Sequence, residues 1–442
     1  MNIQLSDHFT YKKLIRFTMP SIGMMIFTSI YGVVDGFFVS NFVGKTPFAA
    51  VNLIYPFLMI LGAFGFMFGT GGSALIAKTM GMGRMEKAQQ LFSMLIFISS
   101  VTGVAIAALG IVFVRPIAAA LGAEAELLEG CVVYGRIILL AMPAFMLQME
   151  FQSFFITAEK PQLGLWTTVA SGVTNMALDA LLVAVFPLGL VGAALATAFS
   201  QAVGGLVPLV YFSRPNTSLM RLRSFAFDGR ALWKTCTNGS SELMSNLSMS
   251  LVSMLYNMQL MRYAGEDGVA AYGVMMYVSF VFISAFIGYS IGTAPIISYH
   301  FGAENREELH NVLKKSLVII GICSVAMAIT GELLARPFSL IFVGYDENLL
   351  ALTLRGFTIF SFSFLFSGLA IYGSGFFTAL NNGLVSAIIS FLRTLVFQIA
   401  AVLLLPLIWE IDGVWLSVVA AELAAAALTA AFLAGLRKKY GY

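Results

Sequence analysis

The sequence has little charge and few of the residues that bind metals. Only 11% of its 442 residues are charged, whereas 59% are hydrophobic. It has only three cysteines, Cys131, Cys236 and Cys323, which lie far apart, and only three histidines. Soluble domains carry about 25% charged residues. These shortages exclude a soluble globular protein, a disulfide framework and a clustered metal site, so the composition is that of a membrane protein.

A phosphate-binding loop of the type G-x-x-x-x-G-K-[ST] is also missing, so we expect no ATP hydrolysis by this chain and no cofactor. What the sequence does have is a series of apolar runs of about 20 residues or more, each long enough to cross a bilayer as a helix. We predict twelve spans, near 14–43, 47–77, 89–114, 130–158, 162–186, 188–212, 233–262, 268–299, 311–335, 351–379, 383–407 and 412–436.

The basic residues predict the orientation of these spans. With the N-terminus in the cytoplasm, lysines and arginines on the cytoplasmic side outnumber those outside by about three to one. Twelve spans also bring both termini to one side. We therefore expect a polytopic protein of the plasma (inner) membrane with both termini in the cytoplasm.

The two halves of the chain resemble each other when the sequence is shifted by half its length. Arg115-Pro116 then coincides with Arg336-Pro337, and Gly71 with Gly292. Six spans per half make the repeats parallel, as in transporters that rock two bundles about a central cavity. The expected fold is all-α, with an N-terminal lobe over 1–212, a basic cytoplasmic linker over 213–234 and a C-terminal lobe over 235–442.

Two acidic residues in predicted membrane helices have the same expected depth. Asp35 follows Arg16 at the same spacing in the sequence at which Asp179 follows Lys160. Both helices begin in the cytoplasm, so each carboxylate lies about 28 Å beyond its basic residue. Intramembrane acids are expensive to bury and are usually functional. We interpret the two as parts of one site, although separate hydrogen-bonded packing roles are the alternative.

Neighbouring polar residues extend this predicted site. Tyr31 is one helical turn before Asp35, and Asn175 is one turn before Asp179. Thr197, on the next predicted helix, reaches the same depth. These are hard oxygen donors, which suit H⁺ or Na⁺ and no soft metal. If the ion is Na⁺, we expect Asp35, Asn175, Asp179 and Thr197 to bind it.

The stretch "MPSIGMMIFTSIYGVVDGFFVSNFVG" and the following "AAVNLIYPFLMILGAFGFMFGTGGSALIAKTMGMGRMEKA" resemble the opening of multidrug and toxic compound extrusion (MATE) transporters. "GLVGAALATAFSQ" and "YHFGAENREE" extend the resemblance over essentially the whole chain. It implies a V-shaped pair of six-helix lobes that exports organic cations or amphipathic compounds in exchange for Na⁺ or H⁺. It implies a secondary transporter and not an enzyme, with no nucleic-acid partner, and we expect a monomer.

The resemblance also implies a location for the coupling site. In the branch similar to the DNA-damage-inducible F (DinF) proteins, the cation site lies in the N-terminal lobe. Its residues match Asp35, Asn175, Asp179 and Thr197 here, and its helix-1 tyrosine matches Tyr31. The NorM-like branch is expected to use acids of helices 7 and 10, but the span 351–379 has no acid.

Three other residues are secondary candidates for coupling. Glu150 lies late on the fourth span between two glutamines, where a hydrogen-bonding role and substrate contact are both open. Glu242 begins the seventh span, close to the cytoplasm. Arg393, on the eleventh span, is expected either to pair with a carboxylate or to contact an anionic group, whereas Glu422 is expected to be structural.

Two rival functions come from other classes. A flippase for lipid-linked precursors needs a cationic cavity, but lysine and arginine are nearly absent from the helix middles. An intramembrane enzyme needs a catalytic set, and His8, His300 and His310 all lie at helix ends or in loops. Asp35 and Asp179 also lack a protease-like Gly-Asp context. Both rivals are therefore less favoured than antiport.

Overall fold

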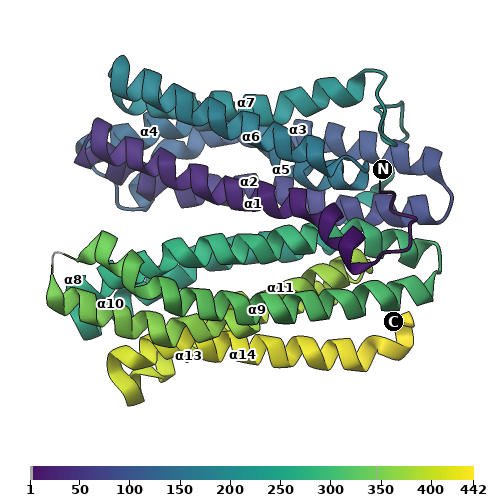
Figure 1. The fold of residues 1–442 in the computed structure, drawn as a ribbon. Coiled ribbons are helices and arrows are strands. Elements are labelled where there is room, and N and C mark those ends of the chain that lie inside the picture. The colour runs from purple at the N-terminus through teal and green to yellow at the C-terminus, as the bar shows by residue number, and fades with distance from the viewer. Residues whose placement is uncertain (1–2, 345) are drawn as a thin grey trace.

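The computed structural model describes residues 3–344 and 346–442, and these form a bundle of long helices (Figure 1). The N-terminal half contains α1 (Tyr11–Phe38), the π-helix η1 (Val39–Val43), α2 (Lys45–Gly81), α3 (Met85–Ala120), α4 (Ala125–Leu140), α5 (Met142–Thr157), α6 (Pro161–Asp179), the π-helix η2 (Ala180–Val185) and α7 (Gly189–Ser213).

The C-terminal half begins with one very long helical element. It contains α8 (Gly229–Gly302), α9 (Arg306–Val343), α10 (Glu347–Phe360), the 3₁₀ turn η3 (Ser361–Ser363), α11 (Phe364–Ala379), α12 (Gly383–Phe391), the π-helix η4 (Leu392–Phe397), α13 (Gln398–Leu404) and α14 (Pro406–Tyr440).

The described residues supply the twelve predicted membrane crossings. Ten helices are long and apolar enough to span a bilayer, and α4 with α5 makes one further span bent by 58°. α8 counts twice, because its 74 residues would be about 110 Å long as a single helix, far more than the ~30 Å hydrocarbon core. It breaks at Gly265, whose φ of 60° and ψ of −150° suit only a residue without a side chain.

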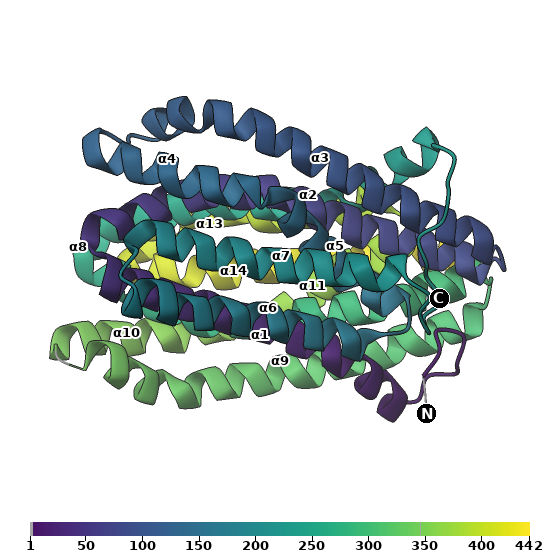
Figure 2. The ribbon, with the colours of Figure 1, turned by 90° about the horizontal axis from the view of Figure 1, so that it is seen from above.

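The helices form two lobes that meet at one end of the molecule. Elements α1 to α7 lie together, as do α8 to α14, and both termini lie at the same end in two perpendicular views (Figures 1 and 2). We call that end the terminal face. A buried cluster near the termini joins the lobes and includes Phe92 and Phe376. Toward the opposite face the buried residues form separate cores, one around Tyr134 and one around Trp415.

Small residues allow the lobes to approach closely at this junction. A Cβ added to Gly302, near the end of α8, would overlap the backbone carbonyl of Lys78 on α2. One added to Gly71 of α2 would overlap the carbonyl of Thr235 on α8. Close backbone packing of this kind is typical of membrane helices. The terminal face is therefore closed by direct contact between α2 and α8.

The segment between the lobes is shorter than the predicted linker over 213–234. α7 ends at Ser213 and α8 begins at Gly229, so residues 214–228 form the connection. Asp228 caps α8 by accepting the backbone N–H of Ala231 at 3.0 Å, and its carboxylate also pairs with Lys87 at 3.0 Å. An aspartate at this position starts a helix, which explains why the helix begins earlier than its apolar run.

Candidate functional site

Asp35 and Asp179 lie on neighbouring helices of the N-terminal lobe. Asp35 is close to the end of α1, and Asp179 is the last residue of α6. The two helices pack closely because α6 has Gly172 at the contact, where a Cβ would lie 2.8 Å from the ring of Tyr31. Asp179 is completely buried, and Asn175, one turn before it, is 2% exposed. Both therefore face the interior of the lobe.

The four predicted cation ligands come together around Asp35. Its carboxylate lies close to the side chains of Asp179, Asn175 and Thr197, which come from α6 and α7. We call these four residues the oxygen cluster. Within the described part of the chain, five of its buried oxygens lack a hydrogen-bond partner: Asp35 Oδ1, Asn175 Oδ1, Asp179 Oδ1, Asp179 Oδ2 and Thr197 Oγ1.

Unpartnered buried oxygens are costly, typically about 1–3 kcal/mol each and more for charged groups. A bound proton or a small hard cation would satisfy them, because carboxylate, amide and hydroxyl oxygens are its usual ligands. No group of three or more His, Cys, Asp or Glu suited to a metal is found among the described residues. The carboxylate, amide and hydroxyl oxygens of the cluster suit a proton or Na⁺.

Both helices that carry the acids change to π-helix directly afterwards. η1 begins at Val39, one turn after Asp35, and η2 begins at Ala180, immediately after Asp179. The two π-helices also contact each other. Such segments are rare and are frequent at functional sites. The wider turn reorients each helix just beyond its carboxylate, a feature that the sequence alone did not predict.

Two tyrosines that sequence analysis missed also face the oxygen cluster. Tyr134 of α4 is buried, interacts with the side chain of Thr197 and lies within electrostatic range of both aspartates. Tyr55 of α2 lies within electrostatic range of Asp35. Tyrosine is common in membrane helices, so neither was distinctive. Sequence analysis could have found them only by comparing their expected depth in the membrane with that of the two aspartates.

The predicted Tyr31 belongs to the edge of this site. It lies one turn before Asp35 on α1, within electrostatic range of that carboxylate, and its side chain interacts with Gln148 of α5. The structure thus brings all five of the predicted residues to one region, in which helices α1, α6 and α7 meet.

The secondary candidates lie elsewhere. Glu150 of α5 is completely buried, but it interacts with Ser99 of α3 rather than with the cluster, and neither carboxylate oxygen has a hydrogen-bond partner among the described residues. In the C-terminal lobe, Arg393 binds Glu422 through two bonds of 2.9 Å. Glu242 lies within electrostatic range of Arg393.

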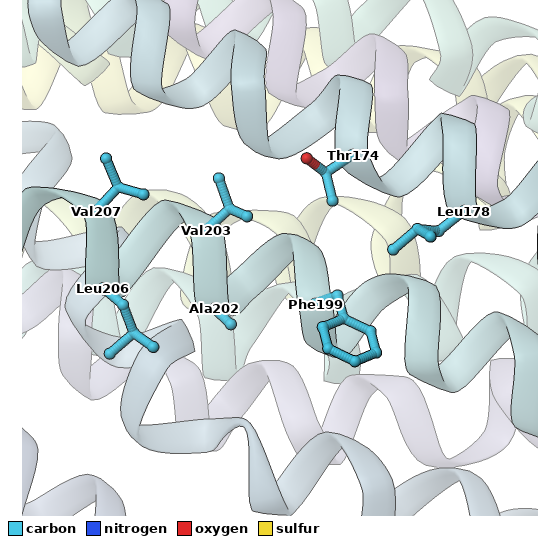
Figure 3. A pocket seen from close by; sticks show the side chains of 7 residues that line it. All are labelled: Thr174, Leu178, Phe199, Ala202, Val203, Leu206 and Val207. Atoms are coloured by element: carbon cyan, nitrogen blue, oxygen red, sulfur yellow. The ribbon is translucent and has the colours of Figure 1, made fainter.

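A shallow groove lies between α6 and α7, apart from the oxygen cluster (Figure 3). It is lined by Thr174, Leu178, Phe199, Ala202, Val203, Leu206 and Val207. The one hydroxyl in it, on Thr174, donates to the carbonyl of Ala170 at 2.7 Å. The groove is thus apolar and offers no group for coupling chemistry.

Two helical lobes that share a core at one end are typical of membrane transporters built from two parallel repeats. The protein-family model MatE matches residues 20–181 and again 243–404, once in each half of the chain. The chain therefore belongs to the MatE family, as the sequence resemblance predicted. It is a secondary transporter and not an enzyme.

Relatives and solved structures agree with this assignment. The multidrug export protein MepA of Staphylococcus haemolyticus is 26% identical over 97% of this chain and 94% of its own length. MepA of Staphylococcus aureus is 24% identical over 93% of this chain and 91% of its own length.

The fold matches that of a multidrug resistance MATE family transporter solved in an outward-facing conformation, with a TM-score of 0.92 at 23% identity over 100% of this chain and 98% of that one. A MOP superfamily transporter from Pyrococcus furiosus matches with a TM-score of 0.88 at 23% identity, over 98% and 97%. Both matches confirm the all-helical membrane fold.

Proposed function

We propose that this protein exports organic cations and other amphipathic drugs in exchange for H⁺ or Na⁺, and that the oxygen cluster of the N-terminal lobe binds the coupling ion. Membership of the MatE family and the similarity to multidrug export proteins support the drug-export part. The buried, unpartnered oxygens around Asp35 support the coupling part. This location of the site is the one expected for the DinF-like branch.

The direction of transport follows from the predicted topology. We propose that the terminal face is cytoplasmic, because the lysine and arginine bias favours that orientation. The shared core then closes the cytoplasmic side, and the separate cores lie toward the outside. We further propose that one chain is the functional unit, since each chain has both lobes.

Coupling requires that ion and drug favour different states of the transporter, because a ligand shifts an equilibrium only by its differential affinity. In our proposal, an ion that reaches the oxygen cluster from outside neutralises Asp35 and Asp179 and draws α1 toward α6. That movement changes the surface that α1 presents to the cavity and releases the drug. Closure outside and opening inside then let the ion leave.

Either ion is compatible with this chemistry. Two neighbouring carboxylates can share one proton, whereas the oxygens of Asp35, Asn175, Asp179 and Thr197 together would replace part of the hydration shell of Na⁺. Glu150 and Glu242 remain proposed secondary coupling positions. Arg393 is bound to Glu422, so it offers little for a lipid-linked pyrophosphate, and the flippase alternative gains no support.

The coupling role is tested by Asp35→Asn in proteoliposomes. Efflux of ethidium is measured under an imposed pH gradient and, separately, under an imposed Na⁺ gradient. We expect gradient-driven efflux to fall by at least about tenfold, equal to about 1.4 kcal/mol, because the amide no longer takes up a charge-neutralising ion. Asp267→Asn, an exposed acid outside the cluster, is the control. Wild-type efflux by Asp35→Asn under both gradients would refute the proposal.

A further inference from the structure

A small cavity lies inside the N-terminal lobe, between α5, α6 and α7. It is lined by Gln148, Phe151, Gln152, Phe155, Gly164, Thr167, Thr168 and Gly204. It is separate from the groove of Figure 3, and its wall carries two amide side chains one helical turn apart on α5, about 6 Å along the helix. Amides are unusual in a helix whose residues are almost all buried.

These amides are not satisfied by the described protein atoms. Gln152 is 4% exposed, and both its Oε1 and its Nε2 lack a hydrogen-bond partner; Gln148 Oε1 also lacks one. Buried polar groups almost always find a partner in protein or water. A polar cavity with two or more such groups is the setting in which a protein holds buried water. The cavity has room for about one particle of the size of water, and its unpartnered amide atoms suit a water molecule or a small cation there.

Gln148 connects this cavity to the coupling site. Its Nε2 donates to Ser171 Oγ of α6 at 3.1 Å, and Ser171 Oγ in turn donates to the carbonyl of Ser200 on α7 at 2.8 Å. On the other side Gln148 lies near Tyr31, which is one turn from Asp35. Polar side chains, those of Tyr31 and Gln148, thus lie between Asp35 and Gln152.

Toward the terminal face, these polar side chains end at an aromatic layer. Gln152 lies about 8 Å along the helix before α5 ends at Thr157. Next to it the rings of Phe151 and Phe155 pack on Phe212, with ring centroids 5.6 Å and 5.3 Å from that of Phe212. Phe155 follows Gln152 on α5, so this aromatic layer adjoins the cavity on the side of the terminal face.

We infer that Gln148 and Gln152 form a hydrated passage inside the N-terminal lobe, through which the coupling ion, a proton or Na⁺, moves between the oxygen cluster and the cytoplasmic face. This inference rests on the proposed function of the cluster. Asp179 and Asn175 face the lobe interior, so an ion bound there needs a route through the lobe. The aromatic layer must part for the ion to leave.

The test is Gln152→Leu, which removes the amide and keeps the size of the side chain. We expect gradient-driven ethidium efflux in proteoliposomes to fall by at least about tenfold. In purified protein, by contrast, the amount of H⁺ or ²²Na⁺ that ethidium displaces should stay at the wild-type level, because the oxygen cluster is intact. Gln152→Asn, which keeps an amide, should restore most of the efflux.

Thr174→Val is the matched control, because Thr174 lies on α6 outside this cavity and its hydroxyl is bound to the carbonyl of Ala170 at 2.7 Å. Wild-type efflux by Gln152→Leu would overturn the proposed passage. It would do so even if Asp35→Asn is inactive and the proposed coupling site is therefore retained. Loss of ion displacement by Gln152→Leu would also overturn it, since Gln152 would then belong to the binding site. Activity of Asp35→Asn, in contrast, would overturn the coupling site itself.

Discussion

At the scale of single residues, the two lobes differ in whether these buried ionisable groups have partners. In the N-terminal lobe, Asp35 and Asp179 have oxygens without a hydrogen-bond partner among the described residues. In the C-terminal lobe, Arg393 and Glu422 satisfy each other through a bidentate pair, with side chains only 15% and 7% exposed. A satisfied pair has little reason to exchange an ion. This difference supports our proposal that the coupling site lies in the N-terminal lobe.

The Arg393–Glu422 pair gives a prediction about stability. Arg393→Met leaves the carboxylate of Glu422 buried and unpaired, which should destabilise the fold by roughly 3–5 kcal/mol. The double variant Arg393→Met/Glu422→Met should recover much of this loss, since no charge is left alone. Thermal unfolding of the purified protein measures both. Equal stability of the single variant and the wild type would show that the pair is not structural.

The individual site residues were predictable to different degrees. Depth counted from basic loop residues found Asp35 and Asp179, and helical spacing found Asn175, because both rules depend only on local sequence. Tyr134 and Gln148 were not predicted as site residues, since their position relative to the site depends on which helices are neighbours in the lobe. Nearly uniform apolar helices give little information about packing order.

At the scale of elements, the positions at which the helices break are as informative about the site and the fold as the helices themselves. η1 and η2 follow the two acidic residues, and Gly265 divides α8 into two crossings. The predicted spans 233–262 and 268–299 already separated these two crossings, because polar residues interrupt the apolar run between them. The π-helices have no such signal, because their residues are ordinary apolar ones. They result from packing and not from local preference.

The contact of α8 with α2 gives a prediction at this scale. Gly302→Ala would place a methyl group against the carbonyl of Lys78 and force the helices apart at the terminal face. We expect a stability loss of about 1–3 kcal/mol and a longer distance between spin labels on the two lobes at that face. Gly321→Ala is the control, because a Cβ there meets no atom within 4 Å. An unchanged distance and stability would contradict the closed junction.

At the scale of the whole molecule, the N-terminal segment adds a second tie between the lobes. The backbone N–H of Leu5 donates to Glu159 in the N-terminal lobe at 2.7 Å. The N–H of Phe9 donates to Glu308 in the C-terminal lobe at 2.8 Å, and its carbonyl accepts from Lys315 at 2.8 Å. These bonds and the shared core must rearrange before the terminal face can open.

The twelve spans and the two-lobed duplication were predictable, since long apolar runs and repeated loop residues are visible in the sequence. The end at which the lobes meet was not. It is determined by small residues such as Gly71 and Gly302 on helices that are distant in sequence, and glycine is frequent throughout the chain. The closed end of the molecule could therefore be identified only from the structure.

The central claim is that drug export is coupled to ion movement through the oxygen cluster. The most direct measurement is the ion flux that an imposed ethidium gradient drives across proteoliposomes without any pre-set pH or Na⁺ gradient. The wild type should move H⁺ or Na⁺ opposite to the drug, and Asp35→Asn and Asp179→Asn should each abolish that ion flux. Drug-driven ion flux that persists at the wild-type rate in both variants would contradict the account.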